Sequence, residues 1–245
     1  MALGKGARLN GAKIIEGVAV TGLLRNEYGR IIGVRTTDGD CTAGAVVSAQ
    51  NIWTPELVAA VGVEVPVVAE RHRVLALACE ASPYSRHMPV FKDLASRGLL
   101  YARSYGGNQM LVSEGLAGEV LDTPDVAPGD VPMDLVADIG EQVADRFPAW
   151  GDAGLASAWT GVYDVTPDWN PVISRTDIDG LVVAAGFSGH GFKIAPAVGR
   201  LVADLVVDGH SSDPRIPESD FRLSRFADGD LLTTPYPYAA AGQMR

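Results

Sequence analysis

The stretch that most constrains this chain is LVVAAGFSGHGFKIAPAVGRLVADLVVDG, residues 181–209. An apolar run of strand length ends in a glycine-rich turn, and the turn opens a segment with the periodicity of an amphipathic helix. Such a turn leaves several backbone N–H groups at the positive end of a helix without intrahelical partners. The stretch therefore predicts a strand–turn–helix unit that binds an anionic or electron-rich ligand.

Two kinds of residue in the turn point to ligand binding. Gly186, Gly189 and Gly191 permit positive φ angles and a close approach of the backbone to a ligand. Lys193 adds a positive charge at a helix start, where the helix dipole already favours negative charge. This small local cost indicates a role for the lysine. The alternative interpretation is a glycine-rich surface turn with a solvent-facing lysine.

A serine between a strand and a helix also suits a second class of protein, the serine hydrolases. Their nucleophile turn has the pattern GxSxG. Gly186 and Ser188 fit this pattern, but His190 stands at the position of the second glycine. The sequence therefore disfavours a hydrolase.

Composition narrows the remaining classes. The 245 residues are 47% hydrophobic and 20% charged, which is ordinary for a globular chain that buries a sizeable core. A net charge of −10 argues against nucleic acid or an anionic membrane as partner. Cys41 and Cys79 form no CxxC pair and the histidines are scattered, so we expect neither a disulfide framework nor a metal site.

Targeting signals are also missing from the sequence. No apolar run approaches the roughly 20 residues of a membrane-spanning helix, and the first residues lack the apolar core of a signal peptide. We therefore expect a cytoplasmic protein.

The order of apolar periodicities and turn residues predicts a mixed α/β fold, with α+β character. We expect short strands over 12–49 with turns at Asn26–Gly29 and Asp38–Gly39, and a buried strand at 45–49. A short helix that Thr54 caps and Gly62 closes should follow. The later expected elements are a strand at 65–80, a hairpin at 98–115 turning at Gly106–Gly107, a helix at 133–150, and strands at 154–166 and 181–185.

Two segments resemble the D-amino-acid oxidase family of flavoenzymes, and particularly its sarcosine oxidase branch. They are GFSGHGFKIAPAVGRLVADLV, residues 186–206, and GVYDVTPDWNPVIS, residues 161–174. Residues 11–53 are similar to the strand cluster of that family that leads to VVNAAGAW. The resemblance covers most of the chain in the order of the family.

The resemblance implies an FAD-dependent oxidoreductase that acts on a C–N bond of an amino acid or a secondary or N-methyl amine, with hydride transfer to flavin N5. The implied architecture is part of an FAD-binding α/β domain interleaved with a mixed, largely antiparallel substrate-binding sheet. Its expected divisions are the remainder of the FAD domain at 1–65, the substrate domain at 66–160, a return to the FAD domain at 161–210, and an irregular tail at 211–245.

The same resemblance implies the roles of particular residues. The glycine-rich turn would lie along the flavin ring, with Lys193 beside it as the catalytic residue. The cofactor-binding positions it implies are Val20, Trp53, Gly161, Gly186, Gly189, His190, Gly191, Phe192 and Lys193. The substrate would contact Tyr101, Arg103 and Tyr163. Arg103 lies two residues after Tyr101, on the same face of the expected strand, although a surface arginine is the alternative.

The largest departure from the family concerns the nucleotide fingerprint. Family members begin with a strand, GxGxxG and a helix that hold the FAD pyrophosphate. GKGARLNG, residues 4–11, has neither the preceding strand nor this glycine spacing. We therefore expect a fragment, a misplaced gene start, or a second chain that supplies the missing half, and weak FAD binding by this chain alone. The alternative function is a non-catalytic remnant or interaction subunit that keeps the fold without cofactor.

Four local departures concern the cofactor and the substrate. Asn51 replaces a usual glycine, and Tyr163 replaces the arginine that binds the substrate carboxylate in glycine oxidase. Met110 is the loose match to a lysine linked to oxygen activation in sarcosine oxidase, which leaves the electron acceptor open. Gly161 stands where some sarcosine oxidases carry the cysteine that bonds to flavin.

Any flavin bound to this protein is predicted to be non-covalent. Gly161 offers no thiol, Cys41 falls in an expected exposed hairpin, and Cys79 ends a strand of the expected substrate domain. Acid precipitation of the flavin-loaded protein should release all of the yellow colour into the supernatant. Colour that stays in the pellet, with a flavin-sized mass increase on one peptide, would contradict this prediction.

Overall fold

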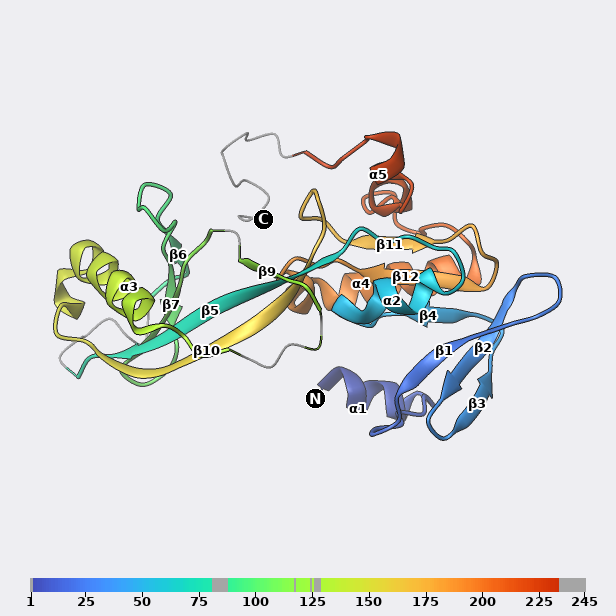
Figure 1. The fold of residues 1–245 in the computed structure, drawn as a ribbon, viewed down its shortest axis with the longest axis horizontal. Helices are drawn as coiled ribbons and strands as arrows, with labels where there is room; N and C mark the ends of the chain where they lie inside the picture. Colours follow the sequence, from blue (N-terminus) through green and yellow to red (C-terminus); the bar gives the residue numbers. More distant parts are fainter. Residues whose placement is uncertain (1, 81–87, 117, 124, 126–128, 234–245) are drawn as a thin grey trace.

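The computed structural model describes residues 2–80, 88–116, 118–123, 125 and 129–233, and it confirms the mixed α/β class. Figure 1 shows an elongated molecule with two lobes joined by two long strands, β5 (Val68–Ala78) and β10 (Gly154–Val165). We call the lobes the α3 lobe and the α4 lobe, after α3 (Met133–Arg146) and α4 (Gly191–Val207). None of the described helices is both long and apolar enough to cross a membrane.

The α4 lobe is built on a sheet in the order β11 (Val172–Arg175), β12 (Leu181–Ala185) and β4 (Val46–Ser48). β12 runs antiparallel to β11 and parallel to β4, and all five of its residues are buried. On one face, Leu201 and Leu205 of α4 pack against Ile173 and Val182. The other face packs around Val58 of α2 (Thr54–Ala59). A helix on each face is why β12 reads as a continuous apolar run.

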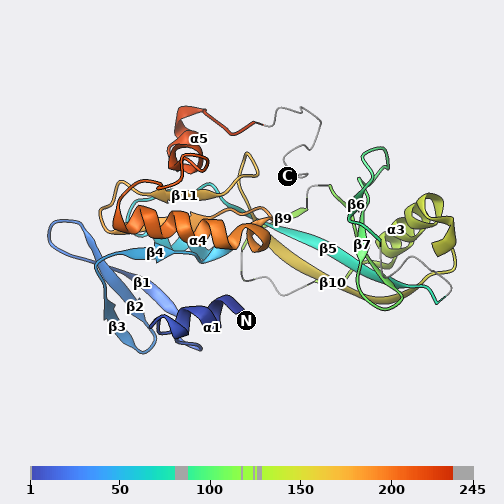
Figure 2. The ribbon, with the colours of Figure 1, turned by 180° about the vertical axis from the view of Figure 1, so that it is seen from behind.

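A separate meander of β1 (Val20–Arg25), β2 (Ile31–Thr36) and β3 (Gly39–Thr42) joins this lobe. Its anchor is Ile31, which is fully buried and donates its N–H to the Asp179 carbonyl at 2.8 Å. Helix α1 (Ala2–Leu9), which the sequence analysis did not anticipate, lies beside the meander in Figure 2.

The α3 lobe is built on a sheet in the order β10-β5-β8-β7-β6, with β8 (Gln109–Ser113), β7 (Tyr101–Ser104) and β6 (Phe91–Lys92). A short strand, β9 (Glu119–Leu121), pairs with the other end of β5. In the long ladder, His72 lies opposite Gly161 and Glu70 opposite Tyr163. These pairs lie on the α4 side of the ladder, because β5 pairs with β8 of the α3 lobe only from Leu75 to Ala78.

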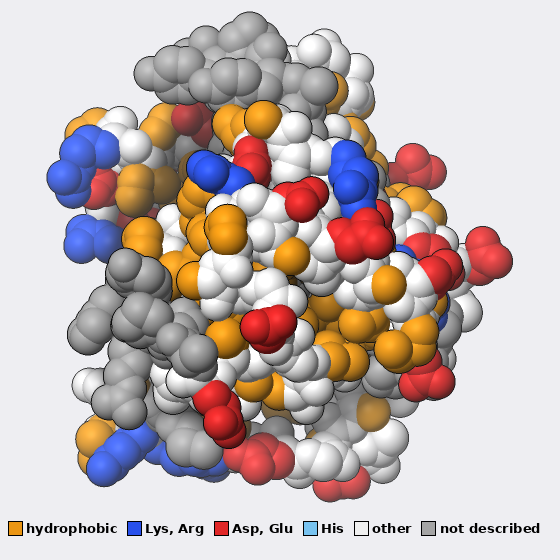
Figure 3. All heavy atoms as spheres, turned by 90° about the vertical axis from the view of Figure 1, so that its left-hand side faces the viewer, with side chains coloured by type: hydrophobic (Ala, Val, Ile, Leu, Met, Phe, Trp, Pro, Cys, Tyr) orange, Lys and Arg blue, Asp and Glu red, His pale blue; other side chains and the backbone are white. Residues whose placement is uncertain are grey.

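Helix α3 covers one face of this sheet, where it buries Ile139 and Val143 against Leu75, Ala102 and Met110. Because side chains alternate along a strand, Tyr101 and Arg103 point to the opposite, open face. Figure 3 looks at the α3 end of the molecule, whose outer surface mixes acidic and basic side chains with small hydrophobic areas.

Most of the expected regular elements are present. The hairpin of β7 and β8 turns at Gly106 and Gly107, which have φ angles of +82° and +55°. The helix at 133–150 is confirmed as α3, followed by the 3-10 helix η2 (Pro148–Trp150). Strand β12 and helix α4 are confirmed as well.

Two local expectations at the start of the chain are wrong. The N-cap of α2 is Trp53, at the end of the 3-10 helix η1 (Asn51–Trp53), and the Thr54 hydroxyl instead accepts the N–H of Gln50. The strand at 45–49 is not fully buried, since Val47 is 38% exposed on the edge strand β4.

The expected irregular tail is partly ordered. Its described residues include the 3-10 helix η3 (Glu218–Phe221) and the short helix α5 (Arg225–Asp228), whereas residues 234–245 lie outside the described part of the chain.

Candidate functional site

A cavity of about 580 Å³ lies where the parallel strands β4 and β12 end and α4 begins. Carboxyl ends of parallel strands are where open α/β sheets bind ligands, and the volume is typical of a small-molecule site. The lining residues are Val47, Ala49, Asn51, Val162, Tyr163, Asp164, Ala184, Phe187, Gly189, Gly191, Phe192, Ala195, Val198, Gly199 and Val202. Most of them are apolar or glycine, which suits a flat, largely apolar ligand.

The glycine-rich turn is held from below by Asp164, the second-last residue of β10. The Gly186 N–H donates to Asp164 Oδ2 at 2.7 Å, and the Ser188 N–H donates to the Asp164 carbonyl at 3.0 Å. Burial raises the pKa of the Asp164 carboxyl, and the backbone N–H donors of the turn oppose this rise. Asp164 therefore fixes the shape of the turn.

The turn backbone adopts left-handed conformations at Gly186, Ser188 and Gly189, with φ of +74°, +48° and +79°. Ser188 is 1% exposed, and its hydroxyl donates to the Gly186 carbonyl while accepting the Thr166 N–H. A buried serine with these partners supports the turn and is not placed as a nucleophile, in agreement with the sequence argument against a hydrolase.

Tyr163 connects the turn to strand β5. Its ring stacks on His72 with centroids 4.1 Å apart, and it contacts Gly189 so closely that a Cβ there would lie 2.5 Å from Tyr163 Cε2. Burial, and then the nearby Tyr101 hydroxyl, raise the pKa of Tyr163. The phenol is therefore protonated at neutral pH and can donate a hydrogen bond.

The start of α4 places several predicted residues at the cavity. His190 is the N-cap residue, and Gly191 and Phe192 line the cavity, with Phe192 99% exposed. Lys193 is the exposed third residue of the helix and is not among the lining residues. The first N–H groups of α4 give this end of the cavity a positive potential, which favours negative charge in a ligand.

The structure explains why Asn51 can replace the glycine that is usual at this position of the family. Asn51 lines the cavity and has a left-handed φ of +56°. Asparagine is among the few residues that tolerate this conformation, so it keeps the backbone shape that glycine would adopt.

The remaining predicted positions do not line the cavity. Gly161 is exposed on β10, and a Cβ there would meet nothing within 4 Å. Trp53 does not line the cavity, and its indole N–H donates to Asp125 Oδ1 at 2.8 Å. Val20 begins β1 in the meander and also lies outside the lining. Arg103, on the open face of the α3 lobe, has its guanidinium 5.7 Å from the Tyr105 ring centroid.

The loose match of Met110 to a flavin-facing lysine is wrong. Met110 is fully buried in the core beneath α3, on the face of the sheet opposite to Tyr101 and Arg103. A shift of one residue along a strand moves a side chain to the other face, so its neighbours Gln109 and Leu111 are on the open side.

Sequence reasoning missed three residues that support the site. Asp164 braces the turn, His72 stacks on Tyr163, and Glu70 is 7% exposed and accepts the Gly118 N–H at 2.9 Å. Side chains alternate between the two faces of a sheet along a strand, so the expected strand at 65–80 could have placed Glu70 and His72 on the same face. No local sequence pattern predicts the role of Asp164, because its partner Gly186 is 22 residues away.

The geometry of the cavity is compatible with a flavin ring. The apolar lining and the glycine backbone beside Tyr163 accommodate a flat ring, and the start of α4 favours negative charge. Within the described residues, no three His, Cys, Asp or Glu side chains gather as a ligand set. The site thus defines a class, a small-molecule site at the ends of parallel strands in an α/β fold.

Comparison with known proteins identifies the family. Residues 1–205 match the family described as FAD dependent oxidoreductase, and the chain belongs to this family. It is 32% identical over 216 residues to a D-amino acid dehydrogenase of Xanthobacter autotrophicus, covering 86% of this chain and 47% of that protein. It is 30% identical to a 4-methylaminobutanoate oxidase of Paenarthrobacter nicotinovorans, covering 93% of this chain and 27% of that protein.

Solved structures of related enzymes share the fold. The L-proline dehydrogenase from P. horikoshii superimposes with a TM-score of 0.82 at 27% identity, covering 94% of this chain and 59% of that one. The glycine oxidase from Geobacillus kaustophilus gives a TM-score of 0.71 at 26% identity, covering 91% and 56%. The chain spans about half the length of the curated D-amino acid dehydrogenases it matches.

Gly189 is predicted to be irreplaceable in the turn. In Gly189→Ala, the new Cβ would lie 2.5 Å from the Tyr163 ring, at a φ of +79° that alanine disfavours. We expect a loss of stability of about 2 kcal/mol in urea unfolding and a changed near-ultraviolet tyrosine signal. The matched control is Gly199→Ala, which lines the same cavity with open space for a Cβ. Equal stability of the two variants would contradict the prediction.

His72 is predicted to make folding less favourable in acid. Burial, and then the charge of Arg73, lower its pKa from 6.5 to about 4, outweighing Glu70 Oε2 at 3.5 Å. The unfolded chain therefore binds the proton more readily, and stability falls as pH drops below 6.5. Between about pH 7 and pH 4.5 this loss of folding stability is about 2 kcal/mol.

The test is urea unfolding of His72→Phe, which keeps an aromatic ring against Tyr163 but cannot titrate. The variant should lose less stability than the parent over this pH range. An unchanged pH dependence in His72→Phe would exclude the buried histidine as its cause.

Proposed function

We propose that this chain is the flavin-facing and substrate-facing part of an FAD-dependent amino acid dehydrogenase or oxidase. The observation that carries the proposal is the cavity at the ends of β4 and β12, closed by the glycine-rich turn and Tyr163. Membership of the family and the similarity to a D-amino acid dehydrogenase support it. When bound, FAD supplies a hydride acceptor for oxidation of a C–N bond.

The cofactor would be held by the backbone of the turn and the first turn of α4. Gly189, Gly191 and Phe192 would border the ring, and Asn51 would face it from the end of β4. Lys193 would add a positive charge at the helix start, where it stabilises negative charge on the cofactor. FAD binding is proposed to be non-covalent, because Gly161 offers no bonding side chain.

The substrate would lie against the open face of the long ladder. Tyr163 and Tyr101 would donate hydrogen bonds through their hydroxyl groups, and Arg103 would pair with a carboxylate. Arg103 already donates to the Ser104 carbonyl at 3.0 Å and lies beside Tyr105, so its guanidinium is held in place before substrate arrives. An amino acid, D, L or N-methylated, is the substrate class that this arrangement suits.

Part of the FAD site is proposed to come from polypeptide beyond these 245 residues, from the same or a second chain. The support is the lack of a strand–GxGxxG–helix fingerprint in the sequence and the partial coverage of the relatives. The pyrophosphate-binding backbone normally contributes much of the affinity for a dinucleotide. We therefore expect weak FAD binding by the 245 residues alone.

The proposal is tested by flavin reduction. The 245-residue chain, and the same chain together with a relative's fingerprint half, are mixed with FAD, and binding is measured by calorimetry. The complemented form should bind FAD, and an anaerobic panel of D-, L- and N-methyl amino acids should bleach its flavin spectrum. A form that binds FAD but is bleached by no amino acid or amine would favour the non-catalytic alternative.

Within that experiment, Lys193→Met should slow flavin reduction or reoxidation by on the order of 10²-fold, as expected for loss of a preorganised charge. The matched control is Arg200→Met, an exposed cation farther along α4 that donates to Ser212. Equal rates for Lys193→Met and the parent in both half-reactions would show that Lys193 has no role in flavin chemistry.

A further inference from the structure

The most deeply buried ion pair among the described residues lies outside the cavity. Arg225 of α5 is 0% exposed, and its Nε and Nη2 donate to the two oxygens of Asp168 at 2.8 and 3.0 Å. The guanidinium also donates to the Asn170 carbonyl at 2.8 Å and lies 4.1 Å from the Phe226 ring centroid. A forked pair of this kind fixes both position and orientation of the carboxylate.

Asp168 organises the turn that follows β10. It accepts hydrogen bonds from the Thr166 hydroxyl at 3.2 Å, the Asn170 N–H at 3.1 Å and the Leu232 N–H at 3.1 Å. Burial alone would raise the pKa of Asp168, but the donors, Arg225 foremost, hold it below its usual range. The carboxylate is therefore charged, and several donors bond to it. Arg225 and Leu232, the two ends of the segment 225–232, are both among these donors.

One route leads from this turn to the glycine-rich turn. The Thr166 N–H donates to Ser188 Oγ at 3.4 Å, and the Thr166 methyl fills the space above Gly186, where a Cβ would lie 2.2 Å from Thr166 Cγ2. Thr166 is 1% exposed, so it has no freedom to move independently of its neighbours. A displacement of the 166–170 turn would therefore shift Gly186 and Ser188 as well.

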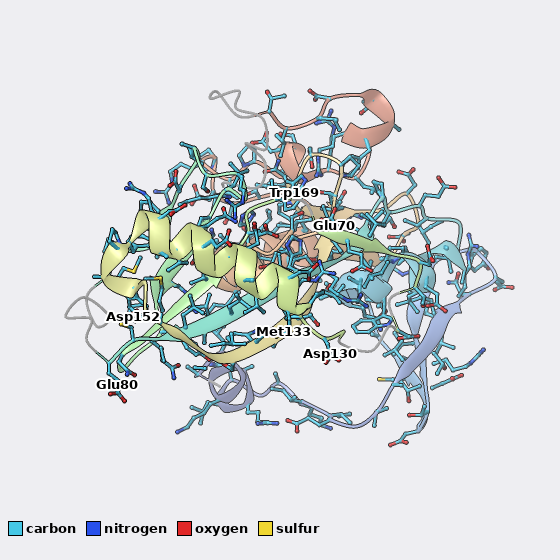
Figure 4. All side chains as sticks on the ribbon, turned by 60° about the vertical axis from the view of Figure 1, so that its left-hand side comes forward. Glu70, Glu80, Asp130, Met133, Asp152 and Trp169 are labelled. Atoms are coloured by element: carbon cyan, nitrogen blue, oxygen red, sulfur yellow. The ribbon has the colours of Figure 1, made fainter. Side chains whose placement is uncertain are left out.

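A second route leads to Tyr163. Trp169 has a left-handed φ of +59°, and its ring meets His72 edge-on with centroids 6.4 Å apart. His72 in turn stacks on Tyr163, which contacts Gly189. Figure 4 labels Trp169 close to Glu70 of β5, in the central part of the molecule. A bulky residue keeps such a backbone conformation only where its surroundings enforce it.

We propose that Arg225 is a positioning residue for the cavity, which holds the glycine-rich turn and Tyr163 in their ligand-binding geometry from the C-terminal segment. The inference rests on the proposed function in that this cavity is the one assigned to the flavin. It adds that residues 225–232 support the site, although none of them lines it.

Hydrogen exchange of the backbone, followed by NMR on the full chain, tests the proposal. The informative amides are those of Gly186, Ser188 and His190, which bond to Asp164 and Phe187 within the turn. Arg225→Lys keeps the charge but removes the fork. We expect these amides to exchange about tenfold faster, the equivalent of one charge-assisted hydrogen bond. Amides of β8, in the α3 core, should be unchanged.

The matched control is Arg222→Lys, which alters a partly exposed ion pair with Asp230. It should leave the glycine-rich turn unchanged. If Arg225→Lys speeds exchange only within residues 166–170 and 218–232, Arg225 merely anchors its own segment and the proposal is wrong.

A milder variant covers the case in which Arg225→Lys loosens the whole fold. Leu232→Pro removes a single N–H donor to Asp168. Faster exchange at Gly186 and Ser188 in this variant supports the proposal, and unchanged exchange there contradicts it. Since the measurement needs neither FAD nor substrate, its outcome is independent of whether the chain has the proposed activity.

Discussion

The hydrogen bonds that Asp164 accepts from the glycine-rich turn are the interaction on which the rest of the structure depends. The carboxylate and carbonyl at the end of β10 hold the turn between β12 and α4. Because β10 begins in the α3 lobe, this contact ties the open face of one sheet to the strand ends of another. The helix start, the cavity and the ring of Tyr163 take their relative positions from it.

Neighbouring side chains pack closely against three glycines of the turn. Thr166 fills the space above Gly186, Tyr163 lies against Gly189, and a Cβ at Gly191 would lie 3.0 Å from the Phe187 Cβ. Glycine is needed here because neighbouring groups occupy the space, as well as for its conformational freedom. The site is therefore rigid before a ligand binds, which reduces the entropy lost on binding.

Elements with strong periodicity could be predicted from the sequence, and contacts between distant residues could not. Strand β12, helix α4 and the β7–β8 hairpin follow from local patterns and turn glycines. The pair of Arg225 and Asp168 joins positions 57 residues apart, in a region that local composition marks as irregular. Met110 shows the other limit, since an uncertainty of one residue in a strand alignment reverses the face.

The continuity of β5 and β10 has a consequence for recombining members of this family. A chimera that exchanges the α3 lobe must cut both strands, and each cut separates residues that are paired across the ladder. Junctions at 66 and 160 would take Glu70 and His72 from one parent, and Tyr163 and Gly161 from the other. An exchangeable α3 module should therefore start after His72 on β5 and end before Gly161 on β10. These junctions keep each pair of the ladder within one parent.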